Sequence, residues 1–375
     1  VVDPNVRANQ GMHYTSVPNI MKVINPLFLD DLQGAYNHLR DQYEQKKRQY
    51  DIGGLTDTQY NKDLKVIHKD CQKLLGRMSK MKFFDPACGS GGMLIEAVRY
   101  MHHDSLCCGS IFGQEKNVVN AAIAKMNLFL HGASDFNIMQ GDTLRSPKIL
   151  QGSGIAKFDC VIANPPFSLD KWGSTEWSSD KFGRNVWGTP SDSCGDYAWI
   201  QHMVKSMSPG NSRMAVVMPQ GILFRGNVEG EIRKRLVKSD LIEAVVTLGD
   251  KLFYGTGLSP CFLILRKMKP AEHSGRILMI DGTKILTAKR AQNILSPEDV
   301  DRLYNLYVDY KDLEDYSKVV TLQEIADKDY NLSPNRYVDY HKEAIRPYEE
   351  VKKEFIEALE AVKKAEEEFK KLINA

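Results

Sequence analysis

The chain has 375 residues, of which 42% are apolar and 26% charged, as in an ordinary globular protein. Fifty basic and 48 acidic residues leave a formal charge of only +2, a weak field for a protein that would hold a polyanion unaided. The seven cysteines include no CxxC pair, which argues against a disulfide framework and a zinc site. With no apolar run of membrane-spanning length and no signal peptide, we expect a cytoplasmic protein without a membrane partner.

The first eighty residues are predicted to be largely helical. Ser16 is a candidate helix cap before Pro18, and the free N–H groups of such a helix start suit a carboxylate, although simple capping explains the pattern as well. Residues 31–80 are rich in charges and Gln and predict two helices that are interrupted at "DIGGLT". The chain begins at Val1 instead of Met, which leaves further upstream residues open.

Short apolar runs that alternate with helical patterns follow, and they predict a doubly wound, mostly parallel α/β sheet. The last two runs are joined by a segment too short for a helical crossover, so we expect them to be antiparallel neighbours. The seven predicted strands are 81–87, 110–115, 136–142, 158–166, 213–219, 241–248 and 260–267.

The last predicted element is a helix over about residues 344–373. Its apolar residues alternate at spacings of four and three, which is the a/d pattern of a coiled coil. They are Val351, Phe355, Ala358, Val362, Ala365, Phe369 and Leu372. We expect this face to pair with a helix of another chain, and the alternative is that the tail folds back on its own domain.

A glycine-rich segment, "FFDPACGSGGML", links the first predicted strand to a helix. Gly89, Gly91 and Gly92 would let the backbone turn tightly beside a ligand. The spacing matches neither the dinucleotide fingerprint nor the phosphate-binding loop, so an ordinary tight turn is the alternative reading.

Acidic residues stand at the ends of three successive predicted strands. They are Asp85, Glu115 and Asp142. In nucleotide-binding sheets the acid after the second strand accepts hydrogen bonds from ribose hydroxyls. Either of the later acids alone fits a solvated loop as well, but the three together predict a ligand site at this edge.

The stretch "CVIANPPFSL" places an amide, two prolines and an aromatic ring directly after a buried strand. Proline cannot donate to a sheet ladder, and it keeps the preceding residue extended. Asn164 to Phe167 should therefore form a rigid tip at the carboxyl edge, where open α/β sheets bind their ligands. The segment 168–195 that follows contains Trp172, Trp177, Phe182 and Trp187, and it fits either a mobile lid or packing on the domain.

At this point the chain resembles a known family. The segments "HYTS", "DPACGSGG", "GQE", "GDTL" and "NPPF" occur in the order of the gamma-type S-adenosylmethionine-dependent N6-adenine DNA methyltransferases. Four longer segments are similar to the modification subunit (HsdM) of type I restriction-modification systems. They are "NPPFSLDKWG", "GRNVWGTPSDSCGDYAWIQHM", "VVMPQGILFRGNVEGEIRKRL" and "LFYGTGLSPCFLIL". The resemblance departs at residues 27–80, where charged helices are inserted.

The resemblance implies a Rossmann-like methyltransferase sheet and assigns roles to residues of this chain. Asn164, Pro165, Pro166 and Phe167 would bind the target adenine, which must be flipped out of double-stranded DNA. The implied S-adenosyl-L-methionine site consists of Met12, His13, Tyr14, Thr15, Ser16, Asp85, Gly89, Ser90, Gly91, Gly92, Glu115 and Asp142. Glu115 would hold the ribose and Asp142 would lie near the cofactor adenine. No metal is expected.

The residue patterns and the resemblance together indicate four regions, and the resemblance implies a set of partners. The regions are a cofactor-binding segment (1–30), a helical insert (31–80), the methyltransferase domain (81–340) and an assembly helix (341–375). The implied partners are a specificity subunit (HsdS) and a second modification subunit, and a restriction subunit (HsdR) is left open. The expected location is the nucleoid of a bacterium or archaeon. The alternatives are a self-sufficient or fused restriction-modification methyltransferase and a non-catalytic assembly subunit.

Overall fold

The computed structural model describes residues 17–103, 109–252, 258–289, 292–341 and 348–373. Unit 1 comprises residues 1–339, and unit 2 comprises residues 340–375. Unit 1 is built on a sheet of nine strands in its described part, with the order β11-β10-β8-β9-β7-β6-β1-β2-β3. In unit 2 the described residues include the helix α11 (Tyr348–Ile373).

All seven strands predicted from the sequence are present. They are β1 (Lys82–Asp85), β2 (Ser110–Glu115), β3 (Phe136–Gln140), β6 (Cys160–Ala163), β7 (Arg213–Pro219), β8 (Ile242–Leu248) and β9 (Pro260–Arg266). β9 lies antiparallel between β7 and β8, which confirms the predicted antiparallel neighbours. The other neighbouring pairs among these seven strands are parallel.

Two further strands extend the sheet beyond the prediction. β10 (Arg276–Gly282) pairs parallel with β8, and β11 (Ser317–Thr321) pairs antiparallel with β10. Both have short apolar runs between polar residues, which give a weak strand signal on their own. A separate small hairpin consists of β4 (Leu150–Gln151) and β5 (Gly154–Ile155).

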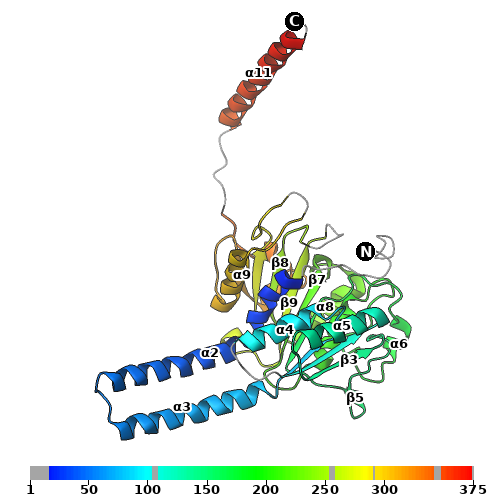
Figure 1. Cartoon of the computed structure of the whole chain (residues 1–375). Coiled ribbons are helices and arrows are strands. Elements are labelled where there is room, and N and C mark those ends of the chain that lie inside the picture. The colour runs from blue at the N-terminus through cyan, green and yellow to red at the C-terminus, as the bar shows by residue number, and fades with distance from the viewer. Residues whose placement is uncertain (1–16, 104–108, 253–257, 290–291, 342–347, 374–375) are drawn as a thin grey trace. The chain divides into compact units, whose positions relative to one another are not determined.

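Alternate residues of the central strands enter two separate cores. Phe83 of β1 belongs to the core formed with α3 (Asp57–Met78), α4 (Gly92–His103), α5 (Val118–Leu130) and α9 (Pro297–Asp309). Phe84 belongs to the core formed with α7 (Asp196–Ser206), α8 (Asn227–Lys238) and α10 (Leu322–Asp327). Helices therefore cover both faces, as in a doubly wound sheet, and Figure 1 shows α4 and α5 side by side on one of them.

The predicted pair of charged helices is confirmed as α2 (Val17–Asp51) and α3. The break occurs at the turn that contains Gly53, whose φ is 76°, and Thr56 caps α3 by accepting a hydrogen bond from the N–H of Gln59. α2 runs without interruption through residues 30 and 31, where we expected a boundary. It packs against α3 and, within the same unit, against α4 and α9 (Figure 1).

The remaining described elements are short. They are α6 (Ser174–Ser178) and the 3₁₀ helices η1 (Gln220–Leu223), η2 (Ala271–His273) and η3 (Pro334–Arg336). Among the described residues, no helix combines the length and the apolar character that crossing a bilayer requires.

Candidate active site

Four neighbouring parallel strands carry the predicted site residues to one edge of the sheet. In spatial order they are β3, β2, β1 and β6, and their carboxyl ends all face the same way. Asp85 ends β1, Glu115 ends β2, and β6 ends directly before Asn164. The fold therefore brings together residues that lie up to about eighty positions apart in the chain.

The glycine-rich loop after β1 is tightly wound. Gly89 and Gly91 have φ values of 52° and 83°, in the left-handed region that favours glycine. A Cβ on Gly91 would lie 3.3 Å from the Cα of Ala124 in α5, so a larger residue would push the loop off this helix. Gly92 instead begins α4. Asn127 of α5 fixes the loop by donating to the carbonyl of Ser90 at 2.9 Å.

Asp85 lies beneath this loop and is 1% exposed. The pKa of Asp85 is raised to about 8: burial is the main cause, a hydrogen bond from the N–H of Ala87 opposes the shift, and the nearby charge of Glu115 adds to it. Since this pKa lies above neutrality, most Asp85 side chains are protonated at pH 7. An incoming positive charge would favour the ionised form.

Glu115 connects the first two strand ends. Its Oε2 accepts the N–H of Gly89 at 2.9 Å, and its Oε1 accepts the N–H of Asn117 at 2.7 Å. Asn117 in turn caps α5 by accepting from Val119 and Asn120. Because a carboxylate has about four acceptor positions, these two bonds within the described chain leave room for two further donors.

Asp142 organises the loop that follows β3. Its Oδ1 accepts the N–H groups of Leu144 and Arg145, both at 3.1 Å, and its Oδ2 pairs with Lys116 at 2.9 Å. The ammonium group of Lys116 is exposed, so this pair is weak and can rearrange. The hydroxyl of Thr143 donates to the carbonyl of Pro86 at 2.6 Å, which ties this loop to the glycine-rich loop.

The tetrapeptide Asn164 to Phe167 extends from the sheet between β1 and β7. β6 is buried throughout, Pro165 is buried, and Asn164, Pro166 and Phe167 are half-buried. The ladder between β6 and β7 ends at Ala163, two residues before Pro165, which has no N–H to donate to a neighbouring strand. The amide and the ring therefore stand at the tip of a rigid strand, next to the glycine-rich loop of β1.

The segment 168–195 is folded against the domain. Trp172 and Trp177 are 3% and 2% exposed and meet edge to face, with ring centroids 5.4 Å apart. Arg184 stacks on Trp177 at 4.2 Å, pairs with Asp180 at 2.7 Å and donates to the carbonyls of Thr143 and Leu144. For these two tryptophans, packing is therefore the correct reading of the two that the sequence left open.

Three functional candidates at this edge were not found from the sequence. Asp196, at the start of α7, accepts the N–H of Ser168, and Arg225 pairs with Asp196. Arg184 joins the segment 168–195 to the loop after β3, as described above. The sequence marks Asp196 only as an acid at a helix start, and nothing local indicates its partner 28 residues upstream. The predicted cofactor residues Met12 to Ser16 lie outside the described residues.

A comparison with protein families decides the assignment. The model of the N-6 DNA methylase family matches residues 65–345. The chain belongs to the N-6 DNA methylase family. The match includes the glycine-rich loop, the three strand-end acids and the Asn164–Phe167 tip, which the fold places on one edge.

Individual relatives within the N-6 DNA methylase family carry more specific names. The MjaVII methylase subunit of a type I restriction enzyme from Methanocaldococcus jannaschii is 37% identical over 298 residues, which are 74% of this chain and 50% of that protein. The HindI methylase subunit from Haemophilus influenzae is 32% identical over 268 residues, 68% of this chain and 58% of that protein. The chain spans about half the length of these relatives.

A solved member has the same fold. The type I restriction-modification methyltransferase subunit from Streptococcus thermophilus superimposes with a TM-score of 0.64 at 31% identity, over 70% of this chain and 55% of that one. The Rossmann-like methyltransferase fold expected from the sequence is thus confirmed.

Proposed function

We propose that this chain is the catalytic part of a modification subunit that transfers a methyl group from S-adenosyl-L-methionine to N6 of adenine in DNA. The observation that carries the proposal is the hydrogen-bonded pairing of β1 with β6. It sets the glycine-rich loop next to the Asn164–Phe167 tip, so a cofactor and a base could meet between two adjacent strand ends. Named relatives that are type I methylase subunits support this choice.

The residues present fit S-adenosylmethionine. A Cβ on Gly89 would meet nothing within 4 Å, so the left-handed turn of the glycine-rich loop faces open space. The remaining acceptor positions of Glu115 suit two ribose hydroxyls, and Asp142 Oδ2 suits an adenine amino group. The buried Asp85 favours a cationic ligand, which this cofactor is. The bound cofactor supplies an electrophilic methyl group.

The adenine end of the reaction depends on Asn164 and Pro165. Adenine N6 is a poor nucleophile because its lone pair is delocalised into the ring. The side-chain carbonyl of Asn164 and the backbone carbonyl of Pro165 would each accept one N6–H, which directs the lone pair of the nitrogen at the methyl group. Phe167 offers a stacking face for the flipped base. The rigid prolines make this an orientational and electrostatic contribution.

The partners belong to the same proposal. The chain would act on double-stranded DNA in a complex with a specificity subunit and a second modification subunit. The net charge of +2 offers little neutralisation of DNA phosphates, and in this proposal the specificity subunit supplies the sequence recognition. In this proposal, residues 1–30 complete the cofactor site, residues 81–340 form the catalytic domain and residues 341–375 serve assembly. The restriction subunit would join only the restricting complex.

Two substitutions with opposite effects test the function. The Asn164→Ala variant should lose N6-methyladenine formation while its cofactor Kd stays within a few fold, since the amide contacts the base. The Glu115→Ala variant should bind cofactor more than about tenfold more weakly, because charge-assisted hydrogen bonds are worth about 1.5–3 kcal/mol each. Mass spectrometry of DNA nucleosides and calorimetric titration give the two readouts.

The control is Asp135→Ala. Asp135 accepts the hydroxyl of Ser110 at the amino end of β2, opposite Glu115, so the cofactor Kd should not change. If Asn164→Ala lost cofactor binding, or if Glu115→Ala kept the wild-type Kd, the assigned roles would be wrong. If the wild-type chain with its specificity subunit formed no N6-methyladenine, the function itself would be wrong.

A further inference from the structure

Ser168, directly after the Asn164–Phe167 tip, has an unusual backbone conformation. Its φ is 49°, in the left-handed region that a residue with a Cβ rarely adopts. Such a conformation persists only where surrounding contacts enforce it. Two contacts do so: the N–H of Ser168 donates to Oδ1 of Asp196 at 2.7 Å, and its hydroxyl accepts from Nη2 of Arg225 at 3.4 Å.

Asp196 and Arg225 form a compact group with Cys194 and Glu229, which we call the Arg225 cluster. Nη1 of Arg225 lies 3.0 Å from Asp196 Oδ2, 3.0 Å from the sulfur of Cys194 and 3.4 Å from both carboxylate oxygens of Glu229. The guanidinium is thus the cation at the centre of a group whose acids and thiol could otherwise suggest a metal site. The Asp196 side chain is fully buried.

The rest of the fold holds the cluster in place. Arg225 follows β7 and η1, and the buried Arg233 of α8 donates to the backbone carbonyls of Arg225 and Ile222. The hydroxyl of Tyr197 in α7 also donates to the carbonyl of Ile222 at 2.8 Å. A Cβ on Gly221 would lie 2.5 Å from Nε of Arg225, so a larger residue at this position would require the guanidinium to move.

We propose that Asp196 and Arg225 are positioning residues that fix the Asn164–Phe167 tip through Ser168, so that the target base meets the methyl donor in register. The inference rests on the proposed function. β6 and β7 are parallel neighbours, and the cluster links the segment after β7 and the start of α7 to the residue that follows the tip. Neither residue needs to touch the base, and the effect of losing them should appear in kcat.

The first variant is Asp196→Asn. An asparagine has one acceptor atom where an N–H from Ser168 and a guanidinium arrive on different oxygens, so one donor loses its partner. We expect kcat to fall by about 10- to 100-fold, the cost of a small misplacement of a reacting group. The KM for DNA and the Kd for S-adenosylmethionine should stay within about threefold, since ground-state binding is not affected.

The second variant, Asp196→Asn with Ser168→Gly, separates positioning from general damage. Glycine adopts the left-handed conformation without enforcement, so the double variant should regain at least about threefold in kcat over Asp196→Asn. A purely structural defect in the core would not be repaired by removing a side chain outside that core. The Arg225→Lys variant keeps the charge but not the planar fork of the guanidinium, so its kcat should lie between those of wild type and Asp196→Asn.

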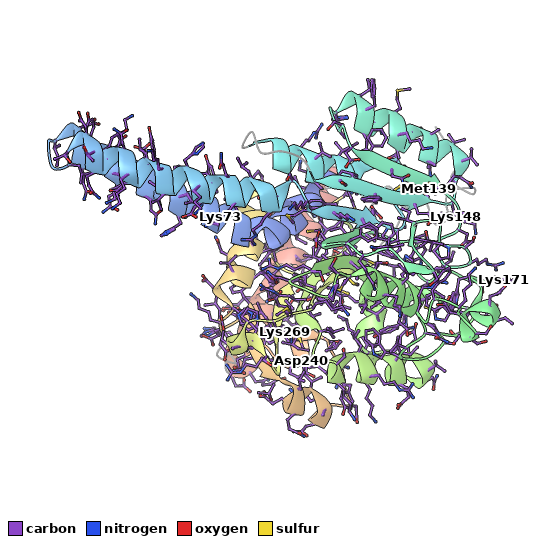
Figure 2. The ribbon with its side chains drawn as sticks, turned by 90° about the horizontal axis from the view of Figure 1, so that it is seen from below. Lys73, Met139, Lys148, Lys171, Asp240 and Lys269 are labelled. Atoms are coloured by element: carbon purple, nitrogen blue, oxygen red, sulfur yellow. The ribbon has the colours of Figure 1, made fainter. Side chains whose placement is uncertain are left out.

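The matched control is Asp240→Asn. Asp240 also accepts a backbone N–H, from Gly275 at 2.9 Å, and pairs with a cation, Lys269 at 2.6 Å. The two side chains lie next to each other in Figure 2, and Asp240 precedes the amino end of β8, opposite the candidate site. This control should keep the wild-type kcat.

The experiment uses the full chain with its specificity subunit, tritiated S-adenosylmethionine and unmethylated genomic DNA. Hydrogen exchange in the peptide 164–172 of the full chain provides a readout without activity. It should accelerate at Ser168 in Asp196→Asn and not in Asp240→Asn. A wild-type kcat in Asp196→Asn, unchanged exchange at Ser168, or failure of the glycine rescue would overturn the proposal. An inactive wild type together with accelerated exchange at Ser168 in Asp196→Asn would refute the proposed function, and with it the catalytic consequence of positioning, while supporting the role of Asp196 in holding Ser168.

Discussion

At the scale of single residues, the carboxyl edge of the sheet combines one buried acid with a raised pKa and two acids that order the neighbouring loops. Asp85 is buried with a pKa near 8, whereas Glu115 and Asp142 are bound to backbone N–H groups of the loops that they order. A carboxyl group kept in such surroundings costs stability, because its ionised form is poorly solvated. Retention of this acid is consistent with a positively charged ligand above it.

We predict that Asp85→Asn stabilises the protein and weakens cofactor binding. The pKa of the wild-type Asp85 rises from 3.8 to about 8 on folding, so between these pH values the native state holds a proton that the unfolded state releases. The stability of the wild type therefore falls as pH rises through this window. The variant should match wild type near pH 4 and exceed it increasingly toward pH 8, by about 1 kcal/mol or more. Urea unfolding at several pH values measures this difference.

The cofactor side of the same prediction uses calorimetry at pH 8. Asp85→Asn should raise the Kd for S-adenosylmethionine, whereas Asp159→Asn should not. Asp159 accepts the N–H of Lys82 at the amino end of β1, the end opposite Asp85. Equal cofactor affinity in wild type and Asp85→Asn would show that Asp85 does not act on the cofactor.

At the scale of elements, Glu243 at the amino end of β8 connects several elements of the fold. This residue of β8 is 1% exposed and accepts from Arg266 of β9 at 3.2 Å, from Tyr307 of α9 at 2.7 Å, and from His273 of η2 when that ring nitrogen carries a proton. His273 stacks on Tyr310 with the rings 3.5 Å apart. One carboxylate therefore links two strands, a 3₁₀ helix and a helix.

We predict that Glu243→Gln destabilises the protein at pH 7 by about 3–5 kcal/mol, since it leaves buried arginine charge uncompensated. Burial alone would raise the pKa of Glu243, but hydrogen bonds from His273 and Tyr307 and the charges of Arg213 and Arg266 lower it to about 2. A lowered pKa stabilises the fold above pH 4.5, and this contribution is lost as pH falls toward 2.

The difference between Glu243→Gln and wild type should therefore shrink in acid, which denaturant unfolding at pH 7 and pH 3 would show. The control is Glu298→Gln, an exposed acid in the first turn of α9, which should change stability by less than about 1 kcal/mol. Equal stability of the Glu243→Gln variant and wild type at pH 7 would contradict the proposed role of the network.

At the scale of the whole molecule, the described residues of unit 2 form one amphipathic helix. In α11 the side chains of Val351, Phe355 and Val362 are 45%, 64% and 60% exposed. They follow the four-and-three spacing expected of a coiled-coil seam. In the proposed function, this seam pairs with a helix of the specificity subunit.

We predict that deleting residues 344–375 leaves cofactor affinity unchanged and abolishes complex formation and site-specific methylation. Size-exclusion chromatography with the specificity subunit, calorimetry and sequencing of methylated DNA measure the three properties. Phe355→Ser on the seam should weaken assembly, while Lys364→Ser on the same helix should not. Site-specific methylation by the purified single chain, or by the truncated one, would refute the assembly role.

Much of the fold could be predicted because its signals are local. Continuous apolar runs mark buried strands, "DIGGLT" interrupts two charged helices, and consecutive prolines end β6 after Ala163. β10 and β11 were missed because a run of a few apolar residues does not distinguish a strand from a buried helix segment. The burial of Trp172 and Trp177 was undecided, since an aromatic residue in a polar loop fits both exposure and packing.

By itself, the sequence determined seven of the nine strands of the sheet, where their loops turn and which residues end them, because Gly, Pro and apolar periodicity act on neighbouring residues. Only the tertiary structure decided that β6 lies next to β1 and that β9 enters between β7 and β8, since strand order depends on contacts between distant segments. It also decided that Asp196 holds Ser168 and that Arg184 reaches the loop after β3. Such partners are selected by the space that packed elements leave between them, and no local pattern encodes that space.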